Sequence, residues 1–168
     1  MSLSFKNRLE LMQHFCTPGT TAIELGVAKA AFSRQILEHT EVSRLYSVDR
    51  WSDHHNEREF RQARNSLKRF GKRSQVIRAT FEDALHCFKD ETFDVIYIDG
   101  YAHTGQEGGE TLRDWWNKLK PGGLFSGHDY HEQWQPTVDA VDQFMADYDH
   151  QLYTTETDKY PSWFTIKG

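Results

Sequence analysis

Residues 93–100 read FDVIYIDG and contain the strongest strand signal in the chain. Phe93 to Ile98 is a nearly continuous run of aromatic and β-branched residues, which favours a strand that is buried on both faces. Asp99 and Gly100 end the run with residues that favour turns. A strand of this kind is typical of a parallel sheet covered by helices.

Strands alternate with helical patterns along the rest of the chain. We expect further strands at residues 21–25, 45–48, 75–78, 124–127, 151–156 and 163–166. We expect helices at residues 3–15, 32–39, 56–70, 81–88, 107–119 and 136–148. The last two strands lack an intervening helix and should pair antiparallel as a hairpin. The prediction is an α/β fold: a doubly wound sheet of about seven strands, mostly parallel, with helices on both faces.

Composition narrows the class of protein. The chain has 168 residues, and 38% of them are hydrophobic, which indicates a single domain spanning residues 1–168. Its net charge of -5 disfavours a general nucleic-acid binder, and no apolar run approaches the roughly 20 residues of a membrane span. No secretory signal is visible at the N-terminus, so we expect a cytoplasmic protein with reduced cysteines at Cys16 and Cys87.

Aspartates gather at the predicted strand ends, where ligands bind open parallel sheets. Asp49, Asp99 and Asp129 each lie at or next to the end of a strand. Helix capping would explain any of them singly. Their recurrence indicates a polar site along this edge.

The loop after the first strand reads ELGVAKA (24–30) and resembles a nucleotide-binding turn. Gly26 allows a tight turn, but Ala28 and Ala30 stand where a dinucleotide fingerprint has glycines. Their methyl groups disfavour close approach to a pyrophosphate. Asp49 follows about twenty residues later, where an acid can accept hydrogen bonds from ribose hydroxyls. A loop or capping role for Asp49 is the alternative.

With these segments the chain resembles the class I S-adenosylmethionine-dependent methyltransferases. The resemblance covers roughly residues 20–135 and rests most on FDVIYIDG (93–100) and LKPGGLFSGHDY (119–130). Within that class it is similar to the small-molecule O-methyltransferases of macrocin and catechol type. The resemblance implies a Rossmann-like fold.

The resemblance also implies which residues bind S-adenosylmethionine: Glu24, Gly26, Ala28, Ser33, Asp49, Arg50, Trp51, Phe81, Glu82 and Asp99. Glu24 would hold the amino group of the methionine portion, and Asp49 would bind the ribose hydroxyls. Arg50 and Trp51 would flank the adenine, although local packing explains Trp51 equally well. The acceptor pocket should be lined by residues 51–56, 101–108 and 130–136.

Methyl transfer to a hydroxyl needs alignment of the nucleophile and its deprotonation. We expect His103, in the loop after Asp99, to act as the general base. A surface-loop or donor-binding role is the alternative for His103. His128 is a rival base, but alternation along the strand would turn its side chain away from Asp129.

A metal ion is a further expectation. Asp99 and Asp129 end neighbouring strands and could share a hard cation such as Mg²⁺. Catechol-type relatives have an asparagine where this chain has Tyr130. Two carboxylates that make hydrogen bonds without a metal are the alternative.

The predicted function is methyl transfer from S-adenosylmethionine to a small-molecule hydroxyl, with neither nucleic acid nor membrane as partner. A nicotinamide-dependent oxidoreductase and a non-catalytic S-adenosylmethionine-binding protein are the alternatives. The chain is short for its class, and a second copy in a homodimer could supply a missing wall of the site.

Overall fold

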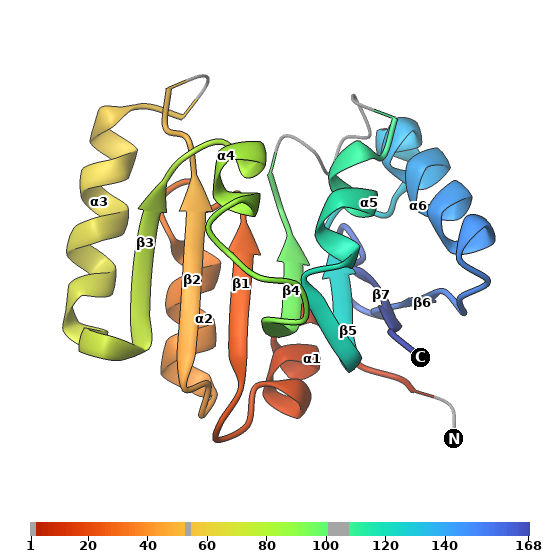
Figure 1. Ribbon diagram of the computed structural model, residues 1–168, viewed down its shortest axis with the longest axis horizontal. Helices are drawn as coiled ribbons and strands as arrows, with labels where there is room; N and C mark the ends of the chain where they lie inside the picture. Colours follow the sequence, from red (N-terminus) through yellow and green to blue (C-terminus); the bar gives the residue numbers. More distant parts are fainter. Residues whose placement is uncertain (1–2, 53–54, 101–107) are drawn as a thin grey trace.

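The computed structural model describes residues 3–52, 55–100 and 108–168, which form a seven-stranded sheet with helices on both faces (Figure 1). The strands lie in the order β3-β2-β1-β4-β5-β7-β6. Their bounds are β1 Thr21–Leu25, β2 Arg44–Asp49, β3 Ser74–Arg78, β4 Phe93–Ile98, β5 Leu119–Gly127, β6 Tyr153–Thr154 and β7 Trp163–Ile166. The pairs among β1 to β5 are parallel, and β7 is antiparallel to both β5 and β6. The predicted Rossmann-like sheet and its closing antiparallel pair are confirmed.

The helices divide between the two faces of the sheet. They are α1 Arg8–Phe15, α2 Ala31–His39, α3 Glu57–Leu67, α4 Phe81–Leu85, α5 Glu110–Trp116 and α6 Gln135–Asp147, with short 3-10 turns η1 Lys68–Arg73 and η3 Glu132–Trp134. One buried cluster joins Ala22 of β1 to α1, α2 and α3. A second cluster joins Ile23 to α4, α5 and α6. Neighbouring strand residues point to opposite faces, so one strand contributes to both clusters.

Three predicted element boundaries differ from the structure. The first helix begins at Arg8, because the Asn7 side chain accepts a hydrogen bond from the N–H of Glu10 at 3.0 Å and caps it there. The expected strand at residues 151–156 is reduced to β6. The expected turn at residues 120–123 lies inside β5, as an irregular stretch where the pairing with β4 shifts register.

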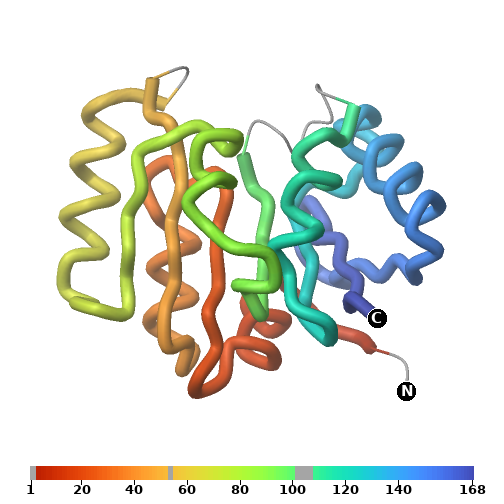
Figure 2. The backbone as a smooth tube through the Cα atoms, viewed as in Figure 1, coloured from red at the N-terminus to blue at the C-terminus, as the bar shows by residue number. Residues whose placement is uncertain are grey.

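The order of the strands reverses between β1 and β4, which run side by side at the centre of the sheet (Figure 2). Their carboxyl ends therefore form the place where a doubly wound sheet binds its ligand. In the part of the chain that the structure describes, no helix is long and apolar enough to cross a membrane.

Candidate functional site

The loop between β1 and α2 turns sharply at the end of β1. Gly26 has a φ of +94°, while Ala28 and Ala30 have φ values of +49° and +63°. The two alanines thus hold left-handed conformations that cost a residue with a side chain about 1–2 kcal/mol each. A Cβ on Gly26 would lie 2.1 Å from Cα of Gly100, the second residue after β4. The backbones after β1 and β4 are therefore in direct contact.

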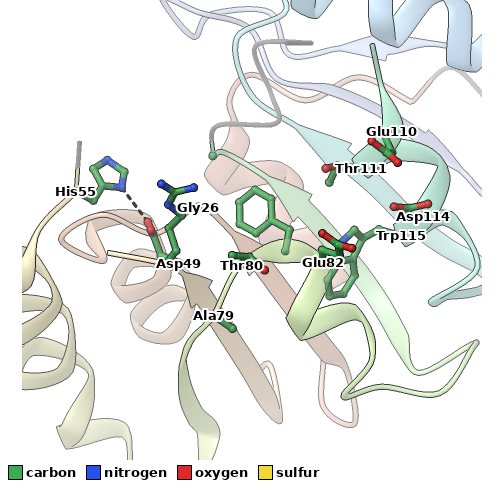
Figure 3. A pocket seen from close by; sticks show the side chains of 13 residues that line it. Gly26, Asp49, His55, Ala79, Thr80, Glu82, Glu110, Thr111, Asp114 and Trp115 are labelled. Carbon is green, nitrogen blue, oxygen red and sulfur yellow. Dashed lines mark hydrogen bonds and ion pairs between the residues drawn. The ribbon is translucent and has the colours of Figure 1, made fainter. Parts of the chain in front are cut away.

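The carboxylate of Asp49, at the end of β2, caps this loop. Its Oδ2 atom accepts hydrogen bonds from the N–H groups of Val27 and Ala28, both at 2.9 Å. Its Oδ1 atom accepts one from the N–H of Trp51 at 3.1 Å, and Nδ1 of His55 lies 2.9 Å from Oδ2 (Figure 3). Burial opposes ionisation, but the three N–H donors and the charge of His55 lower the pKa of Asp49 below its ordinary value. Asp49 is therefore an anion at neutral pH.

A cavity of about 360 Å³ opens beside this carboxylate, between the strand ends and helices α4 and α5 (Figure 3). It is lined by Gly26, Asp49, Arg50, His55, Ala79, Thr80, Phe81, Glu82, Gly100, Glu110, Thr111, Asp114 and Trp115. Its volume falls in the range of small-molecule sites, roughly 300–1,000 Å³. Five residues predicted to bind the donor are in this lining, namely Gly26, Asp49, Arg50, Phe81 and Glu82. Their binding role stays a prediction.

Glu24 lies behind the loop, outside this lining of described residues, and is 1% exposed. Its carboxyl group accepts a hydrogen bond from the hydroxyl of Ser33, which itself accepts one from Ser47 at 3.0 Å. Burial raises the pKa of Glu24 to about 8, although the bond from Ser33 lowers it. Glu24 and Ser33 thus belong to a buried network. This network must open before Glu24 can touch a ligand.

Trp51 packs in the core instead of facing the cavity. Its indole is 1% exposed, donates a hydrogen bond to the carbonyl of Ala28 at 2.8 Å and contacts the ring of Phe60 at 4.9 Å. Neither Trp51 nor Ala28 is among the described residues that line the cavity. The structure therefore favours the packing alternative for Trp51.

A cluster of four charged side chains lies at the ends of β4 and β5. Nδ1 of His128 is 2.8 Å from Oδ1 of Asp129 and 3.4 Å from Oδ1 of Asp99. Nη1 of Arg8, from α1, donates to Oδ2 of Asp99 at 3.0 Å. The expectation that His128 turns away from Asp129 is wrong. The strand ends at Gly127 and Asp129 has a φ of +58°, which interrupts the alternation of side chains.

The two carboxylates do not fit the predicted Mg²⁺ site. In residues 3–52, 55–100 and 108–168, no group of three or more His, Cys, Asp or Glu side chains could hold a metal ion. Burial opposes the charge of His128, but hydrogen bonds to Asp129 and Asp99 and their charges outweigh it and raise the pKa of His128 to about 9. Arg8 and His128 are thus cations at neutral pH, and they take the places that a divalent ion would need.

The predicted general base, His103, lies outside the described residues. His128, its rival, is largely protonated at neutral pH because of its raised pKa, so it is a poor base there. The catalytic roles of His103 and Asp99 stay predictions.

Sequence reasoning missed the wall of the cavity that α5 supplies. Glu110, Thr111, Asp114 and Trp115 occupy one face of that helix and line the cavity. Their spacing was a visible signal, but helical periodicity does not say which face meets the strand ends. His55 lies in the range 51–56 that was expected to line the acceptor pocket. None of residues 130–136, all described, is in the lining.

Comparison with known proteins identifies the family. A family model described as a methyltransferase domain matches residues 23–130, which is more than half of the chain. The chain therefore belongs to this methyltransferase-domain family. A search of curated proteins finds no match.

Solved structures share the fold at low sequence identity. An O-methyltransferase from Bacillus cereus in complex with SAH is 16% identical, with a TM-score of 0.71 over 95% of this chain and 78% of that chain. An rRNA methylase from Streptococcus thermophilus is 14% identical, with a TM-score of 0.68 over 95% and 93%. Spermidine synthase from Thermotoga maritima is 18% identical, with a TM-score of 0.69 over 97% and 58%. The protein has the fold of the class I S-adenosylmethionine-dependent methyltransferases, and this fold serves several different acceptors.

Proposed function

We propose that the protein transfers a methyl group from S-adenosylmethionine to a hydroxyl of a small molecule. The capping of the loop by Asp49 carries this proposal. In dinucleotide-binding loops, backbone N–H groups at the helix start face a pyrophosphate. Here the N–H groups of Val27 and Ala28 bond to a carboxylate, which would repel a phosphate. S-adenosylmethionine has no phosphate, so this arrangement supports a methyl donor over a nicotinamide cofactor.

The ribose of the donor would lie against Asp49. A carboxylate has about four lone-pair positions, and Oδ1 accepts one backbone hydrogen bond here. A ribose hydroxyl can donate to the remaining position on Oδ1, and a second hydroxyl can replace His55 at Oδ2. Arg50, Phe81 and Glu82 would then surround the adenine, with Phe81 supplying an apolar ring and Glu82 an acceptor for the amino group.

The chemical step is an in-line displacement. The acceptor oxygen attacks the methyl carbon while the C–S bond breaks, and the electron pair stays on sulfur to leave S-adenosylhomocysteine. Alignment of the two reactants can contribute about 7–11 kcal/mol. In this proposal His103 takes the hydroxyl proton, and the step needs no divalent ion between Asp99 and Asp129, because Arg8 and His128 hold both carboxylates.

The proposal extends to the setting of the reaction. The chain would act as one domain in the cytoplasm on a small molecule, without nucleic acid or membrane as partner. A homodimer could complete the acceptor pocket. A macrocin- or catechol-type acceptor agrees with the sequence motifs in residues 93–100 and 119–130.

Thermal shift with three ligands tests the donor. S-adenosylmethionine and S-adenosylhomocysteine should each stabilise the protein by about 2.7 kcal/mol at 100 times their Kd, whereas NAD should not. Asp49→Asn removes the charge but keeps the shape, and it should weaken both nucleosides. Stabilisation by NAD alone would favour the oxidoreductase alternative.

Turnover of labelled donor against a panel of hydroxylated metabolites tests the reaction. His103→Asn should bind the donor normally and transfer methyl slowly. Normal donor binding without turnover on any acceptor would favour the non-catalytic alternative.

A further inference from the structure

Arg8 is the first residue of α1, yet its side chain reaches the end of β4. Nη1 donates to Oδ2 of Asp99 at 3.0 Å, and the guanidinium carbon lies 4.2 Å from the ring centroid of Phe32 in α2. The backbone N–H of Arg8 donates to Oδ2 of Asp158 at 2.8 Å, and Asp158 also accepts a bond from Thr155. Segments far apart in the sequence therefore hold this arginine beside the carboxyl end of β4.

The ion pair adjoins the narrowest part of the site. The N–H of Asp99 donates to the carbonyl of Leu25 at 2.7 Å, and the next residue, Gly100, contacts Gly26. Gly26 and Gly100 both line the cavity proposed for the nucleoside. A chain that extends from a sulfonium nucleoside past these two glycines would reach Arg8 and Asp99. In S-adenosylmethionine that chain ends in a carboxylate and an ammonium group.

We propose that Arg8 and Asp99 form a recognition pair for the zwitterionic amino-acid end of the donor, in which Arg8 binds the α-carboxylate and Asp99 binds the α-ammonium. This inference rests on the proposed function. The two side chains are 28% and 22% exposed, so a ligand can reach them. In the free protein they neutralise each other, and a zwitterion inserted between them leaves the net charge unchanged.

The geometry of the guanidinium allows both bonds at once. A guanidinium carries five N–H donors in a fixed fork, and one of them bonds to Asp99. Arg8 can therefore keep a contact with Asp99 while the fork meets a carboxylate in a bidentate manner. The pair would distinguish donors that keep the amino-acid end from nucleosides that lack it.

A purely structural role is the competing explanation. As a link between α1 and β4, the Arg8–Asp99 pair would stabilise the fold without contacting any ligand. Loss of Arg8 would then lower the melting temperature and would weaken all nucleosides equally or not at all.

Two nucleosides separate these explanations in isothermal titration. S-adenosylhomocysteine has the amino-acid end, and 5′-methylthioadenosine has the same thionucleoside without it. Arg8→Gln should weaken S-adenosylhomocysteine by about 10- to 100-fold, as expected for a charge-assisted contact, and leave 5′-methylthioadenosine unchanged. Arg8→Lys keeps the charge without the fork and should show a smaller loss. Arg34→Gln, at a surface ion pair with Glu38, is the matched control and should change neither affinity.

Each outcome has one meaning. Equal weakening of both nucleosides by the Arg8 variants, or no weakening, overturns the recognition pair while the proposed function stands. Failure of the wild-type protein to bind either nucleoside overturns the proposed function, and this inference with it. If Arg8→Gln does not fold, the comparison of the two nucleosides in Arg8→Lys decides.

Discussion

Replacing Gly26 by alanine tests the contact between the ends of β1 and β4. The new Cβ would lie 2.1 Å from Cα of Gly100, 2.3 Å from its nitrogen and 2.4 Å from the carbonyl oxygen of Asp99. These are backbone atoms that no side-chain rotation can move, so the two strand ends must separate. Overpacking costs about 1–3 kcal/mol, and the φ of +94° adds about 1–2 kcal/mol for a residue with a Cβ. We expect a total loss of about 2–5 kcal/mol from an unfolding free energy on the order of 5–15 kcal/mol.

Gly19 provides a matched control for this substitution. Its φ is also +94°, but a Cβ there would have nothing within 4 Å. Gly19→Ala should therefore cost only the backbone strain of about 1–2 kcal/mol. Urea denaturation followed by circular dichroism gives both values from the shift in midpoint at unchanged slope.

The difference between the two variants measures the contact between the strand ends. Equal losses for Gly26→Ala and Gly19→Ala would refute the close approach of Gly26 to Gly100. The same separation should remove binding of S-adenosylhomocysteine, so a Gly26→Ala variant that binds it normally would refute the position of the donor site.

Four further results are expected. Ala30→Gly should raise the free energy of unfolding by about 0.5–1 kcal/mol, because it relieves left-handed strain by more than it adds unfolded-chain entropy; a lower urea midpoint would contradict this. Glu24→Gln should gain stability relative to wild type as pH rises from 4.5 to about 8. Burial raises the pKa of Glu24, so the stability that its neutral form contributes is complete below the ordinary pKa and is lost through that window, while glutamine does not titrate; parallel pH profiles would count against it. His128→Gln should cost most below pH 6.5, and its deficit in melting temperature should shrink as pH rises through about 9, because the raised pKa makes the imidazolium the stabilising form; a deficit independent of pH would exclude that ion cluster as its cause. EDTA should leave methyl transfer unchanged, and a loss that added Mg²⁺ restores would show that Asp99 and Asp129 bind a metal after all.

The sequence by itself determined the kind of sheet and the edge where the site lies. Apolar runs with the period of strands alternate with helical spacing, and this local pattern implies parallel crossovers. Aspartates after the strands then mark the carboxyl edge, because topology alone brings those ends together. Asp49 and Gly26 could be placed in this way without coordinates.

Only the tertiary structure decided which side chains meet at that edge. Arg8 and Asp99 are 91 positions apart, and their contact depends on how α1 packs across the sheet. The bridge from His128 to two carboxylates depends on one backbone angle at Asp129, which periodicity does not carry. Whether a carboxylate faces a metal, a ligand or a neighbouring cation follows from packing over long sequence separations, and local pattern contains no information about such contacts.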